Sequence, residues 1–351
     1  MTVVIADDGL LGLADLAPAD WIIRWYSGRD IPPNLLNGAS ALLIRSTTRI
    51  IADTLPKTVK FIGTATIGTD HLPLADLGKR GIEVVSAPGC NAFAVTDYVL
   101  SQLLNWAKFR GRSLEQLTLG IIGVGAVGSL LEVRSSLLGI RCLVSDQPRY
   151  DRCNLPQHLP PLDVIRQSDV VSLHVPLLSK GPYRTERLLD SSALVEFSNN
   201  SLLINASRGP VLHEYDLLSN PQFDLVLDVF PNEPVISDSL INRSWRISPH
   251  VAGHSAEGKL RGTKQIVRVL ADLTGASMNP LNEEAFLNSV AGQRYAGGAL
   301  AERIRKSCSI AETDRLLREM FINAFERERP NLFDQVRHSY LLRRESEFFP
   351  L

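Results

Sequence analysis

Short apolar segments alternate with longer amphipathic segments through the first hundred residues. The short segments are rich in β-branched residues, end at polar or turn residues, and cover residues 2–6, 41–44, 60–62 and 82–85. They lack the alternation of apolar and polar positions seen in half-exposed strands, as expected for strands buried on both faces. The segments between them are long enough for helices. This pattern predicts an α/β fold in which helices cover both faces of a parallel sheet.

A second series of apolar segments begins near Leu117 and is more regular than the first. It comprises residues 118–122, 141–145, 170–175, 201–205, 225–228 and 245–248. Helical segments separate most of them, so we expect six strands over roughly 130 residues, the size of a dinucleotide-binding sheet. Farther along, residues 257–273 carry apolar side chains at helical spacing. They predict a helix that returns to the first domain and closes it.

The last 71 residues differ in composition from the rest. Of these, 22 are charged, against 53 of the first 280. Ser309 and Glu312 have the spacing of a capping box. An apolar stripe at helical spacing follows them and contains Leu316, Leu317, Met320, Phe321 and Ala324. A segment of this size cannot bury a large core alone, so we expect an appended α/β module that packs on a partner or a second subunit. A solvated helical appendage is the alternative.

The overall composition excludes several classes of protein. The chain has 351 residues, of which 44% are hydrophobic and 21% charged, and its net charge is −1. It can therefore bury cores, and it lacks the excess cations of a nucleic-acid-binding protein. No apolar run reaches the roughly 18 residues of a membrane span, and the first residues lack the cationic flank of a signal peptide. The four cysteines are widely spaced, so we expect neither disulfides nor a metal site, and a cytoplasmic location.

A glycine-rich loop follows the first strand of the second series. Gly123, Gly125 and Gly128 form the pattern GxGxxG between a predicted strand and a predicted helix. The glycines permit a tight turn, a close approach of pyrophosphate to the backbone and close packing of helix on strand. Asp146 ends the next strand, 18 residues after Gly128, where a carboxylate can bind the adenosine ribose and would repel a 2′-phosphate. The pattern favours NAD over NADP, although Arg149 nearby weakens that preference; a glycine turn without nucleotide is the alternative.

Three polar residues follow later strands of the same series. Arg208, Glu233 and His250 each come soon after a predicted strand, and ligands of open α/β sheets bind at the carboxyl ends of strands. Together they suit the oxidation of a hydroxy acid. A histidine can take the hydroxyl proton, a carboxylate can orient the imidazole, and an arginine can hold the substrate carboxylate. Taken singly, each could be a loop or surface residue, and His71 and His174 are rival bases for which we expect structural roles.

Several sequence blocks resemble the D-isomer-specific 2-hydroxyacid dehydrogenase superfamily, and within it the erythronate-4-phosphate dehydrogenase family. The blocks span residues 44–46, 61–71, 87–92, 181–185, 204–209, 257–263 and 333–345. The resemblance therefore covers nearly the whole chain. It implies NAD-dependent oxidation of 4-phospho-D-erythronate to 2-oxo-3-hydroxy-4-phosphobutanoate, in vitamin B6 biosynthesis.

The resemblance also implies roles for individual residues. It makes Arg208, Glu233 and His250 catalytic. The positions expected to contact NAD are Asp146, Val175, Ala206, Ser207, Arg208, Asp228 and Gly253, together with the three loop glycines. The positions expected to contact substrate are Ser46 and Thr66, with Arg45 as a basic partner for phosphate. His254 stands where the family usually has a substrate-binding tyrosine. Simple capping of strand ends is the alternative for Ser46 and Thr66.

The fold expected from the resemblance has three parts. A Rossmann-type doubly wound sheet at residues 96–254 is inserted in a flavodoxin-like substrate domain at residues 1–95 and 255–279. A small C-terminal α/β domain at residues 280–351 is expected to form a homodimer. Two alternatives stay open: another D-2-hydroxyacid dehydrogenase, acting on phosphoglycerate or glycerate, and a non-catalytic NAD-sensing interaction protein.

Overall fold

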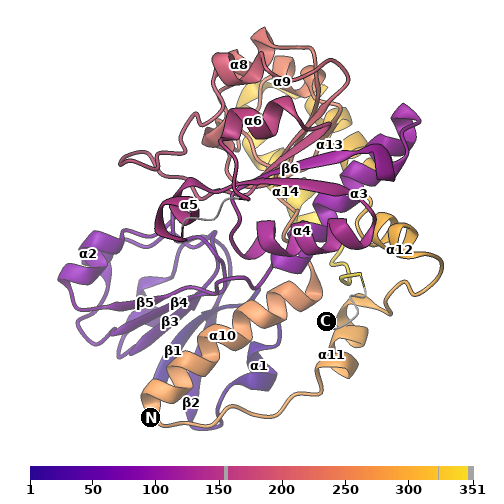
Figure 1. Ribbon diagram of the computed structural model, residues 1–351. Coiled ribbons are helices and arrows are strands. Elements are labelled where there is room, and N and C mark those ends of the chain that lie inside the picture. Colours follow the sequence, from indigo (N-terminus) through magenta and orange to yellow (C-terminus); the bar gives the residue numbers. More distant parts are fainter. Residues whose placement is uncertain (154–156, 323, 347–351) are drawn as a thin grey trace. The chain divides into compact units, whose positions relative to one another are not determined.

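The computed structural model describes residues 1–153, 157–322 and 324–346, and the chain divides into two compact units. Unit 1 comprises residues 1–91 and 254–293, and unit 2 comprises residues 92–253 and 294–351. The chain therefore passes from one unit to the other at residues 91/92, 253/254 and 293/294. Each unit carries one parallel sheet (Figure 1). The finer three-part division stays a prediction.

Unit 1 contains five parallel strands in the order β2-β1-β3-β4-β5, the order of flavodoxin-like sheets. The strands are β1 (Thr2–Asp7), β2 (Trp21–Tyr26), β3 (Ala41–Ile44), β4 (Phe61–Thr64) and β5 (Glu83–Val85). Four of them were predicted from the apolar pattern. The prediction missed β2, an edge strand that pairs only with β1. Because Ile22 and Trp25 of β2 are exposed, the strand lacks the signature of burial on both faces.

Helices cover the sheet of unit 1. They are α1 (Leu13–Leu16), α2 (Leu74–Lys79), α10 (Ala256–Thr274) and α11 (Glu283–Ala291), with short 3-10 turns η1 (Pro33–Leu36) and η2 (Ala52–Thr54). The long helix α10 packs against β4 and α1 (Figure 1). It matches the helix predicted at residues 257–273, and its buried residues include Ile266, Val267 and Leu270. The prediction that this helix returns to the first domain is confirmed.

Unit 2 contains six parallel strands in the order β11-β10-β9-β8-β6-β7. They are β6 (Thr118–Ile122), β7 (Arg141–Ser145), β8 (Val170–Leu173), β9 (Leu202–Asn205), β10 (Asp224–Leu227) and β11 (Arg246–Ile247). A single parallel bridge between His158 and Val144 adds a rudimentary position beyond β7. With that position the sheet has the doubly wound order of Rossmann folds, and its direction of winding reverses between β6 and β8. All six strands were predicted, most within two residues at each end.

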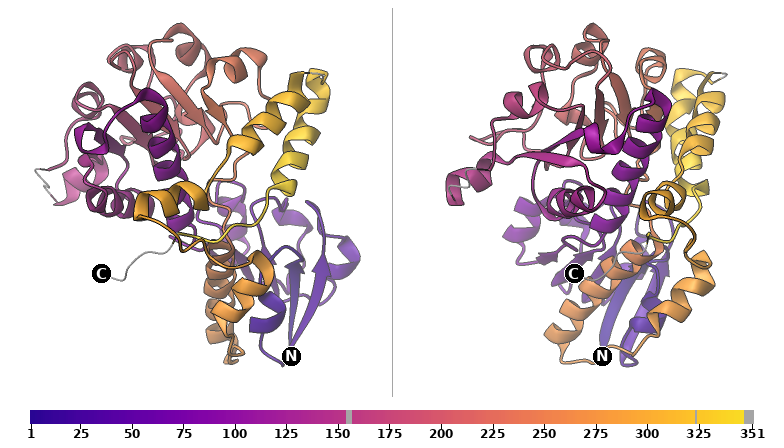
Figure 2. Two further views of the ribbon diagram at one scale, coloured as in Figure 1. Left: turned by 90° about the vertical axis from the view of Figure 1, so that its right-hand side faces the viewer. Right: turned by 45° about the vertical axis from the view of Figure 1, so that its right-hand side comes forward.

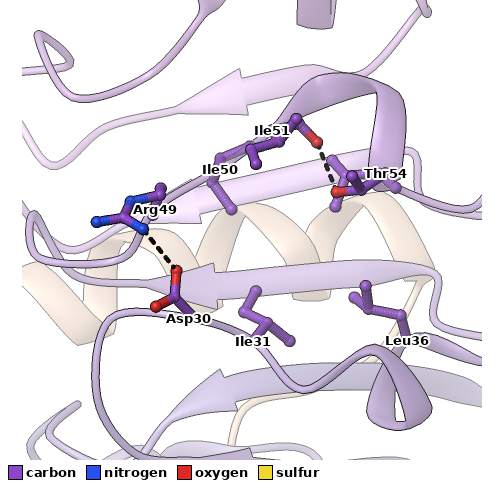
Figure 3. A pocket seen from close by; sticks show the side chains of 8 residues that line it. Asp30, Ile31, Leu36, Arg49, Ile50, Ile51 and Thr54 are labelled. Carbon is purple, nitrogen blue, oxygen red and sulfur yellow. Dashed lines mark hydrogen bonds and ion pairs between the residues drawn. The ribbon is translucent and has the colours of Figure 1, made fainter.

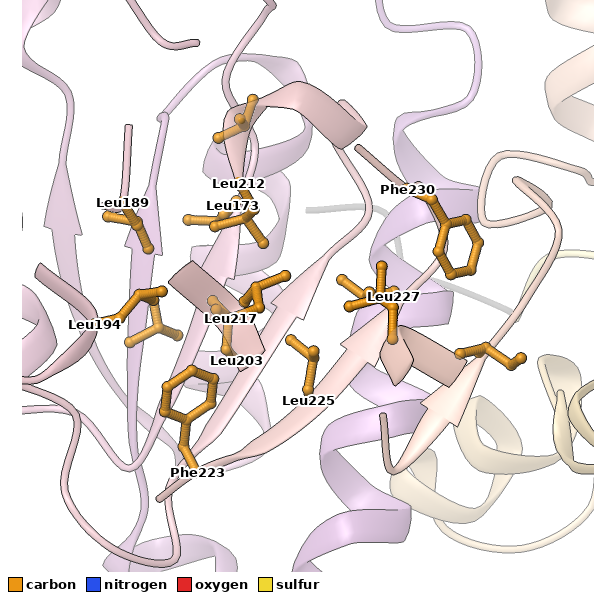
Figure 4. Packing of buried hydrophobic residues seen from close by; sticks show 14 of the residues in the cluster. Leu173, Leu189, Leu194, Leu203, Leu212, Leu217, Phe223, Leu225, Leu227 and Phe230 are labelled. Atoms are coloured by element: carbon orange, nitrogen blue, oxygen red, sulfur yellow. The ribbon is translucent and has the colours of Figure 1, made fainter. Parts of the chain in front are cut away.

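The core of unit 2 lies between this sheet and its helices. The helices are α3 (Ala92–Arg110), α4 (Ala126–Leu137), α5 (Gln147–Cys153), α6 (Pro161–Arg166), α7 (Ser191–Leu194), α8 (Glu214–Ser219) and α9 (Asp238–Arg243), with η3 (Leu114–Gln116) and η4 (Gly209–Val211). Figure 4 shows Leu203 of β9 and Leu225 of β10 near Phe223 and Leu217 in this core. None of the described helices is long and apolar enough to cross a membrane.

Residues 294–351, here called the tail, belong to unit 2, whereas the first residues of the predicted C-terminal module, with α11, belong to unit 1. Its described elements are helical: α12 (Leu300–Ser307), α13 (Ala311–Ile322), η5 (Glu326–Glu328) and α14 (Arg329–Ser339) (Figure 2). The sequence led us to expect an α/β module here, and the described tail residues show helices instead, because their apolar positions recur at helical spacing. Leu317 and Phe321 of the predicted stripe are buried, and Phe333 packs edge-on against Phe230 at 6.1 Å between ring centres. The tail thus completes the core of unit 2.

Candidate functional site

Three neighbouring strands of unit 2 carry the predicted catalytic residues at their carboxyl ends. Arg208 follows β9, Glu233 follows β10 and His250 follows β11, and these strands lie side by side in the order β11-β10-β9. Because parallel strands end at one edge of the sheet, the three loops lie along that edge. The topology therefore confirms the placement of these residues on adjacent loops, while their catalytic roles stay a prediction.

His250 and Glu233 form a hydrogen-bonded pair. The Nδ1 atom of His250 lies 2.7 Å from Oε1 of Glu233, and the two side chains are 36% and 22% exposed. A carboxylate at Nδ1 fixes the ring orientation and leaves Nε2 as the nitrogen that can exchange a proton with a substrate. His250 has φ of 58°, a conformation that non-glycine residues rarely adopt and that often occurs at functional positions. The pair has the arrangement of an oriented acid/base.

Asp228 holds the loop that carries His250. Its carboxylate is fully buried and accepts hydrogen bonds from Ser248 Oγ at 2.6 Å, Val251 N at 2.8 Å and Ala252 N at 3.0 Å. Burial raises the pKa of Asp228, although His250 and these donors act in the opposite direction. The family resemblance implied that Asp228 contacts NAD, which stays a prediction. The structure gives its carboxylate a structural role in the loop.

Tyr98 of α3 extends this network. Its hydroxyl lies 2.8 Å from Ser248 Oγ, and burial raises its pKa well above the usual value, so the hydroxyl keeps its proton. Because Ser248 donates its own proton to Asp228, Tyr98 donates to Ser248. The chain of Tyr98, Ser248 and Asp228 links the middle of α3 to the histidine loop. Sequence reasoning missed Tyr98, which is 150 residues away from Ser248.

The loop of Arg208 is held against the loop of Glu233. Asn205 at the end of β9 accepts from the backbone N–H of Ser207 at 3.0 Å and donates to the Arg208 carbonyl at 3.0 Å. A side chain at Gly209 would meet the carbonyl oxygen of Phe230 at 1.8 Å. Only glycine permits this approach. The structure thus brings the Arg208 backbone next to the segment that leads to Glu233.

The glycine-rich loop has the features that a dinucleotide needs. A Cβ at Gly125 would meet no atom within 4 Å, whereas one at Gly128 would meet the Gly123 carbonyl at 2.1 Å. Backbone is thus open to a phosphate at Gly125, where α4 begins without a side-chain cap, and packing is tight at Gly128. Asp146 accepts from Val124 N at 2.8 Å and from Arg149 N at 3.0 Å. The loop therefore fits NAD, and the contact of Asp146 with the adenosine ribose stays a prediction.

The remaining predicted NAD positions lie along the same strand ends. Val175 follows β8, Ala206 and Ser207 follow β9, and Gly253 ends the segment after His250. Val175 borders the glycine loop, since a Cβ at Gly123 would meet its side chain at 2.9 Å. Ser207 donates its hydroxyl to Asn205 at 2.8 Å. These positions line one edge of the sheet, as the prediction requires.

His174, a rival for the base, has a different environment. Its Nε2 lies 2.9 Å from Ser172 Oγ, and burial lowers its pKa to about 3. A histidine of this kind is neutral near pH 7 and does not accept a substrate proton readily. The described surroundings therefore favour the structural role expected from the sequence.

Unit 1 carries its polar cluster at the carboxyl ends of β1, β3 and β4. Arg45, which follows β3, donates from Nε to Asp7 at the end of β1 at 2.7 Å. Asp7 also lies 3.5 Å from Thr48 Oγ1, which is 2.6 Å from the hydroxyl of Tyr26. The Arg45 side chain stays 30% exposed while Asp7 is buried. A buried acid thus fixes an arginine whose side chain stays partly exposed. The sequence suggested Arg45 but missed Asp7, Thr48 and Tyr26.

The hydroxyl-rich segment after β4 forms a second part of this cluster. Thr64 Oγ1 lies 2.9 Å from Thr66 Oγ1 and 3.3 Å from Nε2 of His71. Thr64 thereby contacts both His71 and the predicted substrate residue Thr66, and a structural role for His71 stays a prediction. Ser46 is exposed, and His254 is partly buried at the start of the returning segment of unit 1.

Each unit contains a pocket. The one in unit 1 has a volume of about 90 Å³ and is bordered by the Asp30–Arg49 ion pair at 3.4 Å (Figure 3). None of the predicted substrate residues lines it. The one in unit 2 has a volume of about 450 Å³, and Pro210, Pro231 and Asn232 of the catalytic loops line it. Among the described residues, no three His, Cys, Asp or Glu side chains are grouped so that they could hold a metal ion.

Comparison with known proteins identifies the family of both parts of the chain. The family described as D-isomer specific 2-hydroxyacid dehydrogenase, NAD binding domain, matches residues 92–252. Erythronate-4-phosphate dehydrogenase of Pectobacterium carotovorum is 39% identical over 333 residues, which are 92% of this chain and 86% of the relative. The protein of the same name from Salmonella arizonae is 37% identical over the same shares of both chains. Similarity of this extent covers the catalytic loops, the substrate segment and most of the tail.

Solved structures confirm the α/β fold. The TT0316 protein of Thermus thermophilus matches with a TM-score of 0.62 at 24% identity, over 80% of this chain and 99% of that protein. D-lactate dehydrogenase of Aquifex aeolicus, solved with NAD and lactic acid, matches with a TM-score of 0.59 at 22% identity, over 78% of this chain and 96% of that one. At these identities the likeness concerns the fold alone.

Proposed function

The chain belongs to the D-isomer specific 2-hydroxyacid dehydrogenase family, and we propose that it oxidises 4-phospho-D-erythronate to 2-oxo-3-hydroxy-4-phosphobutanoate with NAD, in vitamin B6 biosynthesis. The relatives named erythronate-4-phosphate dehydrogenase, which match over 92% of the chain, support the substrate. The observation that carries the chemistry is the 2.7 Å hydrogen bond between His250 and Glu233. It provides an oriented base at the edge of a nucleotide-binding sheet.

The roles of the residues follow from their chemistry. NAD, when bound, accepts the hydride. His250 takes the proton of the reacting hydroxyl through Nε2, and Glu233 keeps the imidazole oriented through its hydrogen bond to Nδ1. Arg208 holds the substrate carboxylate with paired donors. In the reverse direction, His250 returns the proton to the oxo group.

The substrate phosphate needs cations and hydroxyl donors, which unit 1 supplies. Arg45 is fixed by Asp7, and Ser46 and Thr66 offer hydroxyls on neighbouring strand-end loops. His254 replaces the usual tyrosine and can also donate a hydrogen bond. These residues support a phosphorylated substrate over a simple hydroxy acid.

We further infer a cytoplasmic homodimer formed through the tail. Ile322, Phe325 and Leu341 of the tail are 80%, 69% and 86% exposed, and exposed apolar side chains of this size favour association. Sedimentation of the full chain at micromolar concentration tests this proposal. A dimer is expected, and a monomer would overturn it.

A substrate panel tests the reaction. Purified protein is mixed with NAD and 4-phospho-D-erythronate, 3-phosphoglycerate or D-glycerate, and reduced nicotinamide is followed by absorbance in a single turnover as well as at steady state. The single turnover registers the reaction even if the reduced cofactor stays bound. We expect kcat/KM for phosphoerythronate to exceed that for the other two by about 100-fold or more, because a phosphate site with charged donors rejects shorter or uncharged analogues. Preference for phosphoglycerate would identify the alternative dehydrogenase, and no turnover of any would favour an NAD-sensing role.

A further inference from the structure

The loop of residues 248–252, here called the histidine loop, ends next to a crossing between the two units. The chain crosses at residues 91/92, at the start of α3, and again at 253/254, directly after the histidine loop. Asp228 and Tyr98 hold the loop at Ser248 and at the backbone N–H groups of Val251 and Ala252. These contacts leave the carbonyl side of Ala252 to be satisfied by another element.

A tail residue satisfies that carbonyl. The Nη2 atom of Arg343 donates to the carbonyl oxygen of Ala252 at 2.9 Å and to that of Ala94 at 2.8 Å. The Arg343 side chain is only 9% exposed, and its Nη1 lies 3.8 Å from Asp97. One guanidinium group therefore joins the two segments of unit 2 that lead into the crossings at 91/92 and 253/254. Ala252 is two residues from His250.

The end of the tail has an anchor that does not involve the histidine loop. The backbone N–H of Ser346 donates to Asp97 at 2.7 Å, and Arg134 donates to the same carboxylate at 2.6 Å. Asp97 and Arg134 are almost fully buried. Since this anchor holds the tail on α3, the contact of Arg343 with Ala252 is an addition to it. The Ser346 hydroxyl also donates to Asp97 and accepts from Arg134 at 2.6 Å. Ser346→Ala therefore weakens the anchor and leaves the contact of Arg343 with Ala252 in place.

We propose that Arg343 is a positioning residue for the reaction, which holds the histidine loop so that His250 meets the substrate hydroxyl in the productive geometry. His250 has a strained backbone with φ of 58°, and strained conformations persist only where surrounding contacts fix them. A buried carbonyl that loses its charged donor exposes the loop to rearrangement. The inference rests on the proposed role of His250 as the acid/base.

The test compares Arg343→Ala with Ser346→Ala and with Arg315→Ala, an exposed tail arginine that pairs with Glu312 and Glu319. We expect Arg343→Ala to lower kcat about 10- to 100-fold, because displacing a catalytic group by about 1 Å has effects of this size. The Kd of NAD, measured by titration, should change less than about twofold, because the variant alters only the geometry at the histidine loop. Arg343→Lys should recover part of kcat, because a lysine can still donate to the loop carbonyl. The two control variants should keep kcat within about twofold of the wild type.

The outcomes separate this inference from the proposed function. If His250→Ala abolishes turnover while Arg343→Ala keeps kcat within about twofold of the wild type, Arg343 only anchors the tail and the inference is overturned. If His250→Ala itself retains turnover, the proposed function fails first. Where Arg343→Ala loses NAD binding through misfolding, Arg343→Lys decides. The single nitrogen of the lysine reaches less far than the guanidinium group of Arg343. A reduced kcat of Arg343→Lys with unchanged NAD affinity would therefore support the positioning role, and a kcat equal to that of the wild type would contradict it.

Discussion

Each unit places a buried aspartate near the carboxyl end of a parallel strand, and the two aspartates are compensated in different ways. Asp7 of unit 1 pairs with the Arg45 guanidinium at 2.7 Å. Asp228 of unit 2 has a serine hydroxyl and two backbone N–H groups as its donors. The first carboxylate holds a cation that can bind an anionic group, and the second holds the backbone of a loop. The same residue type thus fixes a binding group in one unit and a reacting group in the other.

The difference in partners predicts a difference in what each cluster controls. A charged pair with one partly exposed arginine should set the affinity for an anion, because a guanidinium group carries several donors. A loop held through its backbone sets the position of the group it carries, and so it affects the chemical step. Variants in unit 1 should therefore act mainly on KM, and variants around the histidine loop mainly on kcat.

The largest effect is expected at His250, the group that the Asp228 network serves. His250→Ala should lower kcat about 10²- to 10⁴-fold, the usual contribution of a general base, with the Kd of NAD nearly unchanged. The matched control is His338→Ala, which removes an exposed histidine of α14. Steady-state and single-turnover rates with 4-phospho-D-erythronate measure both. Full turnover by His250→Ala would show that another group takes the proton.

The two aspartates are compared directly by the variants Asp228→Asn and Asp7→Asn. In Asp228→Asn the amide NH2 group faces a backbone N–H donor in a buried site, so two donors meet without an acceptor. We expect the free energy of unfolding to fall by about 1–3 kcal/mol and kcat to fall as well. In Asp7→Asn the partly exposed Arg45 can still be hydrated. The free energy of unfolding of this variant should therefore fall less, by about 1 kcal/mol or less. Its main effect should be on the KM of the phosphorylated substrate.

Urea unfolding and steady-state kinetics of both variants check this contrast. Equal changes in kcat for the two variants would show that the aspartates do not divide binding from chemistry. A change in stability without any change in KM for Asp7→Asn would show that Arg45 does not contact the substrate.

Much of unit 2 was predictable because its signals are local in the sequence. The glycine loop, Asp146 and the trio of Arg208, Glu233 and His250 each adjoin a strand, and strand ends meet at one edge of a parallel sheet. The partners of these residues were not predictable in this way. Which side chain lies beside them depends on sheet order and on helix packing.

One hydrogen-bond network of unit 1 shows which contacts the sequence does not predict. Asp7 and Tyr26 end β1 and β2, and Thr48 follows β3. These strands are neighbours because β1 lies between β2 and β3 in the sheet. The sequence pattern did not reveal β2 as a strand, so Tyr26 had no predicted neighbour. Arg343 is a stronger case, since 249 residues separate it from Ala94. Such contacts follow from tertiary packing, which short-range periodicity does not encode.

A smaller change at Arg45 itself sharpens the assignment to binding. Arg45→Lys keeps the charge but loses the planar fork of donors, so we expect KM for the phosphorylated substrate to rise about 10-fold and kcat to change by less than about threefold. Arg49→Lys, at an exposed arginine paired with Asp30 at 3.4 Å, is the matched control. Initial rates over a range of substrate concentrations measure both constants. A fall in kcat at constant KM would instead place Arg45 in the chemical step.

The effect on turnover should be smallest at His174, a third polar residue that follows a buried strand and acts on stability instead. It carries no charge near neutral pH, because burial lowers its pKa to about 3. The unfolded chain binds this proton near pH 6.5, so the stabilising effect of the neutral ring is present above that pH and is lost as the pH falls from 6.5 toward 3. Between pH 7 and pH 5 the wild type should therefore lose about 2 kcal/mol more than His174→Gln in the free energy of unfolding. Urea unfolding at both pH values measures the difference, and parallel losses in the two proteins would mean that the buried ring accepts a proton as readily as the unfolded chain does.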